Sequence, residues 1–513
     1  MNVAHHLERA AKERMDDPAI IMMKTGERIS FFDLDWKSGA IARGYAIAGI
    51  HPGDRALVMV RPGIDLILTV WACFKSGVIP VLIDPGMGLT NFLACVKRIG
   101  PTTLIGVPEA HILSYLSYWS WPGLHTRVYS GWKAGFDGVT MTELIGSPGV
   151  ERPRKVYPEE PAAVLFTSGS TGPAKAVQYT HGNFNAQVTA LRDTYGYRSG
   201  QVDVAAFPPF SLFDAALGIT SVIPDLDAAN MAATRPEAIA DAITQHGAQN
   251  VFGSPVIWRK FAPWAAERGL TFPTVERLMI AGASVPPPLV AQLRSLLPNG
   301  DVGTPYGATE ALPVAAVWGK DLVERFAEKS AAGRGTCVGK PAAGTEVRIL
   351  RASSEPVSDV AAAEWLPDGE VGEICVSGPV VTALYLDNAD ANEISKIPID
   401  EDSVWHRMGD LGYRDDEGNL WLCGRKAEAV GANYTDCIEG IFNPFCGRTA
   451  LVGVNGEPWL VVEGAHDEAI AKRVMETGHV RGVLFHPAFP VDKRHNSKIH
   501  RKTLAAWAAK AAK

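Results

Sequence analysis

The chain has 513 residues, of which 47% are hydrophobic and 20% charged, and its formal net charge is −7. This balance is typical of a globular protein and argues against nucleic acid as the main partner, because nucleic-acid binding usually needs a basic face. The most hydrophobic window, residues 66–83, is interrupted by Lys75, Gly77 and Pro80, so we expect no membrane span. Residues 1–17 contain no apolar signal core and the seven cysteines show no CxxC spacing, which predicts a cytoplasmic protein with reduced thiols.

The N-terminal part of the chain alternates between helical and strand-like patterns. Helical spacing over residues 32–48 precedes an apolar strand at 55–60, and a second helix at 64–75 precedes a strand at 77–83. Such alternation predicts crossover units and a largely parallel sheet. The segment 113–132 is rich in Tyr and Trp, and we expect these side chains to pack in the core or to form a lipid-side wall.

The same alternation returns in the middle of the chain, for example with a strand at 202–207, which predicts two related α/β subdomains. Strand patterns at 370–378 and 420–423 indicate a smaller, β-rich subdomain. The remaining residues combine short strands and helices into a small α+β unit. We therefore predict an α/β fold with a large N-terminal domain at residues 1–424 and a small C-terminal domain at residues 425–513.

A run rich in glycine and hydroxyl groups follows the apolar strand predicted at 162–166. Its two glycines let the backbone turn N–H groups toward an anion, and its hydroxyls and lysine add donors. The residues predicted to hold a polyphosphate are Thr167, Ser168, Gly169, Ser170, Thr171, Gly172 and Lys175. The run lacks the Gly-Lys-Ser/Thr ending of a Walker loop, and a Gly/Ser surface turn is the alternative interpretation.

Two shorter motifs downstream could hold the rest of a nucleotide. Gly282 and Ala283 follow an apolar strand and leave room for a planar ring against the backbone. In the run TPYGATE, Tyr306 can stack on a base, Thr309 can donate to a phosphate, and Glu310 can hold a hard cation such as Mg²⁺. A tight turn, a core tyrosine and a solvated glutamate are the alternatives.

Three further residues complete the set of candidate nucleotide-binding and catalytic residues. Asp410 follows a glycine turn and is suited to accept hydrogen bonds from a ribose diol, and Arg425 supplies a cation nearby. Lys498 stands between polar residues near the C-terminus. Surface turns and basic tails carry the same residue types, so these motifs gain meaning from their order and spacing.

In this order the motifs resemble those of the adenylate-forming superfamily of acyl-CoA synthetases, luciferases and peptide-synthetase adenylation domains, over residues 30–504. The resemblance implies that residues 1–424 contain the ATP and acyl pockets, and that residues 425–513 form a mobile lid carrying Lys498. It also implies ATP and Mg²⁺ as cofactors. The resemblance implies that residues 167–175 bind the β- and γ-phosphates, Thr309 binds the α-phosphate and Glu310 binds Mg²⁺. It implies that adenine lies against Gly282, Ala283, Tyr306 and Gly307 and that Asp410 and Arg425 bind the ribose. It also implies that Lys498 bridges the reacting carboxylate and the α-phosphate oxygens.

The chain departs from most members of that superfamily after Gly424-Arg425. Relatives that use coenzyme A have an Asp, a Lys and a Gly at set spacing there, whereas this chain has Glu428, Gly431 and Tyr434. The Tyr434 side chain would crowd a pantetheine. The run 207–213 also lacks the histidine that often gates the acyl pocket. We therefore expect that coenzyme A is not used.

Two local runs, residues 306–314 and 489–499, resemble the olefin β-lactone synthetases of bacterial long-chain olefin biosynthesis. The resemblance implies that ATP activates the carboxylate of a 2-alkyl-3-hydroxy fatty acid. The 3-hydroxyl of the same molecule then closes a β-lactone, which releases AMP. Besides this hydrophobic substrate, the implied partners are other enzymes of an olefin pathway.

A long-chain fatty acyl-CoA ligase is the nearest alternative, and a catalytically inactive nucleotide-binding module is another. The general base for the 3-hydroxyl is not identified by any motif, and His181, His495 and His500 are the candidates. We expect residues 207–218 and 254–261 to form walls of the acyl pocket. None of these motifs indicates the acyl chain length or stereochemistry of the substrate, or the oligomeric state of the protein.

Overall fold

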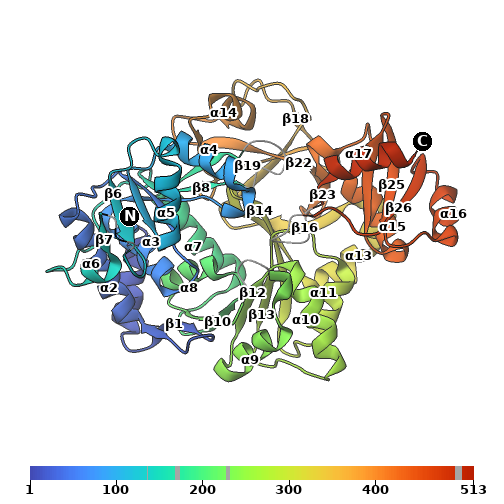
Figure 1. Cartoon of the computed structure of the whole chain (residues 1–513). Coiled ribbons are helices and arrows are strands. Elements are labelled where there is room, and N and C mark those ends of the chain that lie inside the picture. The colour runs from blue at the N-terminus through green and yellow to red at the C-terminus, as the bar shows by residue number, and fades with distance from the viewer. Residues whose placement is uncertain (134, 136, 168–173, 227–230, 492–498, 513) are drawn as a thin grey trace.

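A computed structural model describes residues 1–133, 135, 137–167, 174–226, 231–491 and 499–512 (Figure 1). Residues 168–172 of the predicted phosphate loop, His495 and Lys498 lie outside these described residues. The fold is mixed α/β, which confirms the predicted fold class, and the strands form three sheets. Helices α2 and α3 confirm the two predicted for the first part of the chain. The helices are α1 (Ala4–Glu13), α2 (Phe31–Ile47), α3 (Ile64–Ser76), α4 (Leu89–Ile99), α5 (Pro108–Leu116), α6 (Met141–Ile145), α7 (His181–Tyr195), α8 (Ser211–Leu217), α9 (Pro236–His246), α10 (Pro255–Glu267), α11 (Pro287–Arg294), α12 (Gly319–Asp321), α13 (Ala327–Lys329), α14 (Ala389–Ser395), α15 (Thr435–Cys446), α16 (Glu468–Glu476) and α17 (Arg501–Ala511).

The first sheet has eight strands in the order β20-β9-β8-β4-β3-β5-β6-β7. From β8 to β7 every neighbouring pair is parallel, as the alternation of helix and strand patterns predicts. β20 comes from much later in the chain and pairs with β9 at the edge. The strands are β3 (Arg55–Met59), β4 (Ile79–Leu82), β5 (Thr103–Gly106), β6 (Thr126–Tyr129), β7 (Val139–Thr140), β8 (Pro161–Phe166), β9 (Ala176–Thr180) and β20 (Tyr385–Leu386).

The second sheet has fifteen strands. β1 and β10 to β14 form its parallel part. The strands that we expected in a separate β-rich subdomain continue from it, because β16 pairs with both β15 and β23. Its strands are β1 (Pro18–Met22), β2 (Arg28–Ser30), β10 (Val202–Ala205), β11 (Thr220–Ile223), β12 (Asn250–Gly253), β13 (Arg277–Ile280), β14 (Asp301–Ala308), β15 (Ala311–Trp318), β16 (Thr336–Pro341), β17 (Glu346–Leu350), β18 (Trp365–Leu366), β19 (Gly372–Ser377), β21 (Lys396–Pro398), β22 (Val404–Arg414) and β23 (Leu420–Arg425).

The third sheet belongs to the C-terminal part of the chain, which lies at one end of the molecule (Figure 1). It consists of β24 (Thr449–Val454), β25 (Glu457–Glu463) and β26 (Gly482–His486). Helices α15 and α16 pack on it through a core of their own that includes Phe442, Leu460 and Val474.

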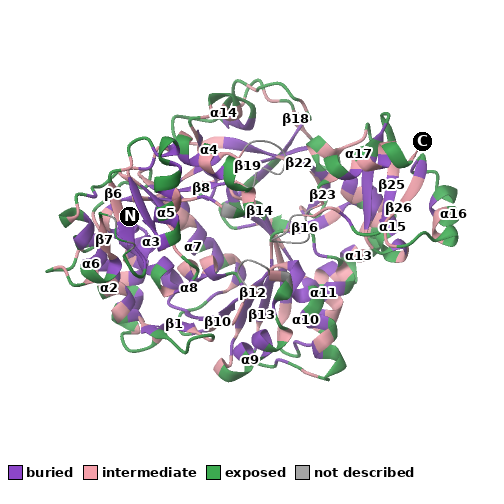
Figure 2. Ribbon diagram, viewed as in Figure 1, coloured by how far each residue is buried: buried purple, intermediate pink, exposed green. Residues whose placement is uncertain are grey.

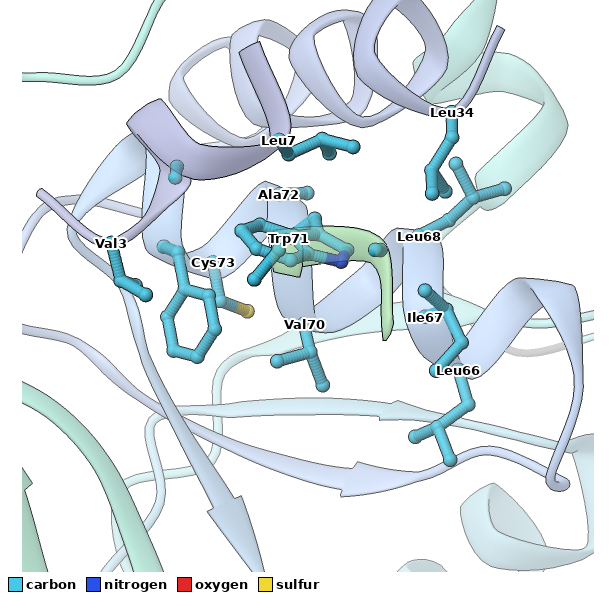
Figure 3. Packing of buried hydrophobic residues seen from close by; sticks show 14 of the residues in the cluster. Val3, Leu7, Leu34, Leu66, Ile67, Leu68, Val70, Trp71, Ala72 and Cys73 are labelled. Atoms are coloured by element: carbon cyan, nitrogen blue, oxygen red, sulfur yellow. The ribbon is translucent and has the colours of Figure 1, made fainter. Parts of the chain in front are cut away.

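The largest core cluster surrounds α3, whose middle is buried on every side. Figure 3 shows Trp71 of α3 below Leu7 of α1, with Leu34 of α2 nearby, whereas Leu66 and Val70 point away from these two helices. Most central strands are likewise buried (Figure 2). At 13 residues α3 is about 20 Å long, and no helix within the described ranges has the length and apolar character needed to cross a bilayer.

The aromatic segment 113–132 differs from the expectation of core packing. Trp121 is buried, but Tyr118, Trp119 and Trp132 are 74%, 61% and 69% exposed. Tyr118 and Trp119 lie in the short 3-10 helix Tyr118–Ser120, and Trp132 lies in a bend. Core packing is therefore wrong for these three residues, and the alternative of a lipid-side wall stays a prediction. The seven cysteines are free thiols, as predicted, and all except the half-buried Cys437 are buried.

Candidate active site

One cavity of about 3040 Å³ lies where the two large sheets and the C-terminal part of the chain meet. It is lined by every predicted nucleotide-site residue that the structure describes. These residues are Thr167, Lys175, Gly282, Ala283, Tyr306, Gly307, Thr309, Glu310, Asp410 and Arg425. They come from segments more than 250 residues apart in the chain, since the series runs from 167 to 425. The sequence motifs therefore converge on a single site.

The two ends of the predicted phosphate loop are held together by backbone contacts. The Thr167 N–H donates to the carbonyl of Lys175 at 3.0 Å, and the Lys175 N–H donates to Thr167 Oγ1 at 3.1 Å. Antiparallel pairing of β8 with β9 brings these ends side by side. Burial lowers the pKa of Lys175, and the nearby Glu310 carboxylate opposes this effect. A partly desolvated lysine at this position is suited to an anionic ligand.

Thr309 and Glu310 form the turn between β14 and β15, in which Ala308 pairs with Ala311. Their carbonyl oxygens are both fixed. Thr309 O accepts from Tyr179 Oη at 2.5 Å, and Glu310 O accepts from the N–H and Oγ1 of Thr382 at 2.9 and 3.1 Å. These contacts fix the turn so that both side chains border the cavity.

The Glu310 carboxylate accepts a hydrogen bond at Oε1 from Tyr385 Oη at 2.6 Å. Within the described ranges no cluster of three His, Cys, Asp or Glu residues could form a metal cage. A single carboxylate beside a phosphate site fits Mg²⁺, which usually binds one or two protein carboxylates and completes its shell with phosphates and water. Glu310 could therefore hold this ion.

Asp410, Tyr306 and Arg425 form a polar triad beside the turn, in which Asp410 and Tyr306 are buried and the Arg425 side chain is 44% exposed. Tyr306 Oη donates to Asp410 Oδ2 at 2.6 Å, and Arg425 Nε lies 3.1 Å from Asp410 Oδ1. Asp410 and Arg425 face each other in register across β22 and β23. Burial raises the pKa of Asp410, while the Arg425 guanidinium and the Tyr306 hydroxyl lower it. The carboxylate is thus held in place by two donors that also line the cavity.

Aromatic side chains line one wall of the cavity, where we predict the acyl chain to bind. Phe207, Phe210 and Phe213 contribute to it, and the Phe210 ring stacks on Phe252 with centroids 4.1 Å apart. These three phenylalanines belong to the segment 207–218, which we expected to line the cavity. Ser254 and Arg259, from the second expected segment at 254–261, line it as well. The sequence motifs did not identify the opposite wall, which includes Leu66, Val70, Phe74, Leu191 and Tyr195 from α3 and α7.

The candidate histidines differ in their surroundings. His181 is buried at the start of α7, where Nδ1 accepts from the Val3 N–H at 3.3 Å, and burial lowers its pKa to about 4. It does not belong to the cavity lining, so its prediction as a base is wrong. His500 is exposed and lines the cavity.

Sequence reasoning missed an ion cluster that borders the cavity, in which Glu373 and Arg407 are buried and Lys426 is half-buried. Glu373 Oε2 accepts from Arg407 Nε at 3.0 Å, from Arg407 Nη2 at 2.7 Å and from Lys426 Nζ at 2.8 Å. The Glu373 and Arg407 side chains are each 2% exposed. The cluster joins β19 and β22 to the residue that follows β23. The signal available in the sequence was the charged residue Glu373 within a stretch that has the pattern of a buried strand.

The residues that depart from the coenzyme A pattern lie in the segment after β23. Glu428 Oε2 lies 2.9 Å from Arg501 Nε, and the same guanidinium bonds both carboxylate oxygens of Glu439 at 2.6 and 3.0 Å. Tyr434 is half-buried and precedes α15. The segment after β23 is thus tied to α15 and α17.

A family model described as "AMP-binding enzyme" matches residues 7–386. A protein named olefin beta-lactone synthetase from Stenotrophomonas maltophilia (strain K279a) is 42% identical, covering 99% of this chain and 98% of the relative. A protein of the same name from Xanthomonas campestris pv. campestris is 41% identical, with 99% and 97% covered. Among solved structures, the amide bond synthetase McbA from Marinactinospora thermotolerans has a similar fold, with a TM-score of 0.80, 22% identity and 99% of each chain covered.

Proposed function

The chain belongs to the family of AMP-binding enzymes and is an AMP-forming ligase, and we propose that it is an ATP-dependent β-lactone synthetase. The enzyme adenylates a 2-alkyl-3-hydroxy fatty acid, and the 3-hydroxyl of the same molecule then closes a four-membered lactone. The observation that carries this proposal is the identity of 42% and 41%, over nearly the whole chain, to two proteins named olefin beta-lactone synthetase.

In the first step a carboxylate oxygen attacks the α-phosphorus of ATP. The bond from that phosphorus to the bridging oxygen breaks, and pyrophosphate leaves. Both reactants are anions, so fixed cations and N–H donors lower the barrier. Residues 167–172 and Lys175 hold the β- and γ-phosphates, Thr309 holds the α-phosphate, and Lys498 bridges the reacting oxygens.

The remaining contacts orient the nucleotide. Adenine lies against Gly282, Ala283, Tyr306 and Gly307, and the Asp410–Arg425 pair binds the ribose. Mg²⁺ neutralises phosphate charge when it is bound with ATP, and Glu310 is the residue that holds it. Support comes from the position of all these residues around one cavity.

In the second step the 3-hydroxyl oxygen attacks the acyl carbon, the bond from that carbon to the AMP oxygen breaks, and AMP leaves. The hydroxyl proton passes to His500 or to a phosphate oxygen of the departing AMP. Because nucleophile and electrophile are in one molecule, the effective concentration of the nucleophile is high. The wall formed by Phe207, Phe210 and Phe213 excludes water, which would otherwise hydrolyse the mixed anhydride.

The proposal includes a lid at residues 425–513 that delivers Lys498 and does not serve coenzyme A. The separate sheet and core of residues 435–486 support an independently moving unit. Tyr434, with its bulky side chain at the start of α15, supports the absence of a pantetheine tunnel.

Product analysis tests the function. The enzyme is incubated with a racemic 2-alkyl-3-hydroxy fatty acid, ATP and Mg²⁺, with and without coenzyme A, and the Lys498→Ala variant is the control. We expect β-lactone and AMP in equal amounts, unchanged by coenzyme A, and neither product from the variant. A thioester that forms only with coenzyme A, with no lactone, would contradict the proposal and establish an acyl-CoA ligase.

A further inference from the structure

Tyr385 donates its hydroxyl hydrogen to the carboxylate of Glu310, and none of the motifs assigns it a role. The contact joins β20, at the edge of the first sheet, to the β14–β15 turn of the second sheet. No other described residue donates a hydrogen bond to this carboxylate or forms an ion pair with it. Tyr385 thus occupies Oε1 and leaves Oε2 without a protein donor among the described residues.

The tyrosine is itself held from several directions. Its side chain is buried, its N–H donates to Asn392 Oδ1 at 2.7 Å, and its carbonyl accepts from Asn392 Nδ2 at 2.8 Å. The backbone also pairs with Val177 of β9. An ionised carboxylate can only accept a hydrogen bond, so the Tyr385 hydroxyl is the donor. A donor fixed in this way restricts the orientation of the acceptor.

Two lysines approach the Tyr385 ring, and both also interact electrostatically with the Glu310 carboxylate. Lys175 Nζ lies 4.6 Å from the ring centroid and Lys396 Nζ lies 5.3 Å from it. Lys396 also donates to the Thr382 carbonyl at 2.5 Å, and Thr382 in turn holds the Glu310 carbonyl. Both amine nitrogens lie within cation–π distance of the ring, so the ring helps to fix the two lysine side chains.

We propose that Tyr385 is a positioning residue for Glu310, which fixes one carboxylate oxygen so that the other is presented to the divalent cation that accompanies ATP. This inference rests on the proposed role of Glu310 as the metal ligand. Outer partners of metal-binding carboxylates orient the ligand, and their loss typically weakens metal affinity about 10- to 100-fold. Removal of the hydroxyl alone should therefore weaken metal binding and leave the ring, with its two lysine contacts, in place.

The test uses Mn²⁺ as the probe and α,β-methylene-ATP as the nucleotide, with free Mn²⁺ followed by electron paramagnetic resonance. We expect Tyr385→Phe to weaken Mn²⁺ binding to the enzyme–nucleotide complex about tenfold. Tyr413→Phe is the matched control, because it removes a hydroxyl that also bonds a backbone carbonyl, that of Arg334, but does so outside the cavity lining. Its Mn²⁺ affinity should stay within about twofold of the unsubstituted protein. Unchanged affinity in Tyr385→Phe would overturn the inference.

A double-mutant cycle separates positioning from general damage to the fold. Glu310→Gln should lose most of the Mn²⁺ affinity, and adding Tyr385→Phe to it should produce no further loss, because the hydroxyl acts through the carboxylate. Additive losses would mean that Tyr385 only supports the fold. If Glu310→Gln binds Mn²⁺ normally, the metal assignment in the proposed function fails instead. Nucleotide affinity in EDTA and thermal unfolding are measured for each variant, so that a misfolded protein is recognised.

Discussion

Asp203 and Asp214 form a buried pair of carboxyl groups under the aromatic wall of the cavity. Asp203 lies on β10 and Asp214 on α8, both side chains are completely buried, and Ser221 Oγ donates to Asp214 Oδ2 at 2.7 Å. Burial raises the pKa of both groups, that of Asp214 to about 7, and the neighbouring Asp214 carboxyl raises the pKa of Asp203 further. The pair therefore retains protons in the folded protein at a pH where the unfolded chain has lost them.

The sign of the effect follows from proton binding. Between about pH 4 and pH 7 the folded protein binds more protons at this pair than the unfolded chain does, so raising the pH through this range lowers the free energy of unfolding. For Asp214, a rise of the pKa from its ordinary 3.8 to about 7 corresponds to a loss on the order of 4 kcal/mol. This loss is complete above the folded pKa and absent below pH 4.

The Asp203→Asn substitution tests this account. The amide stays neutral at all pH values and can donate to Asp214, so the variant needs fewer bound protons to fold. We expect the unfolding midpoint of the unsubstituted protein to fall by several degrees between pH 5 and pH 8.5, and the variant to lose less than half as much. The variant should be the more stable protein at pH 8.5 but not at pH 5.

Thermal unfolding is measured at half-unit pH steps, with Asp193→Asn as the control. Asp193 is an exposed carboxylate on α7, paired with its neighbour Arg192, and its removal should leave the pH dependence unchanged. Parallel curves for Asp203→Asn and the unsubstituted protein would refute the reasoning, because the buried pair would then make no contribution to the pH dependence.

Three further substitutions have definite expected results. Lys175→Met should slow pyrophosphate release about 100-fold, because a cation at the phosphates is lost, while lactone closure from a supplied acyl adenylate stays within a few-fold; equal loss in both assays would contradict this. Glu373→Gln should lower the free energy of unfolding, measured by urea titration, by about 3–5 kcal/mol, because it leaves Arg407 and Lys426 without their carboxylate. The exposed control Glu364→Gln should lower it by less than about 1 kcal/mol. Phe210→Ala removes a stacked ring from the acyl wall and should raise the KM for the fatty acid while the KM for ATP is unchanged; a change in the KM for ATP alone would place the ring on the nucleotide side.

The candidate residues of the nucleotide site could be chosen from the sequence because each part is a short, contiguous motif. The structure confirms that the described candidates line one cavity, and their individual roles stay predictions. The run ending at Lys175 and the turn at Thr309 and Glu310 combine glycine, hydroxyl and charge within a few residues, and the chemistry of a phosphate ligand demands such combinations. The run follows β8 of the first sheet and the turn follows β14 of the second, so their convergence on one cavity depends on how the two sheets pack together.

The surroundings of these motifs were not predictable, because their partners are remote in the chain. Tyr385 meets Glu310 across 75 residues, and Val3 meets His181 across 178. No local pattern distinguishes a histidine that accepts from a distant backbone N–H from one that serves as a base. The sequence likewise shows that residues 113–132 are rich in aromatic side chains. Whether each ring is buried depends on the elements that pack against it. Tyr118 and Trp119 have no such cover among the described elements.

The register that pairs Asp410 with Arg425 has a mechanical consequence. Arg425 is the last residue of β23, so the chain leaves the large sheet immediately beside the predicted ribose contact. In any rotation an atom travels in proportion to its distance from the axis. If residues 426–513 turn about this point, the Asp410–Arg425 pair sits near zero radius, while α16, on the far side of the third sheet, sweeps the longest arc (Figure 1). A nucleotide bound by this pair could thus stay in place during the rotation, while a different surface of residues 426–513 comes to face its phosphates.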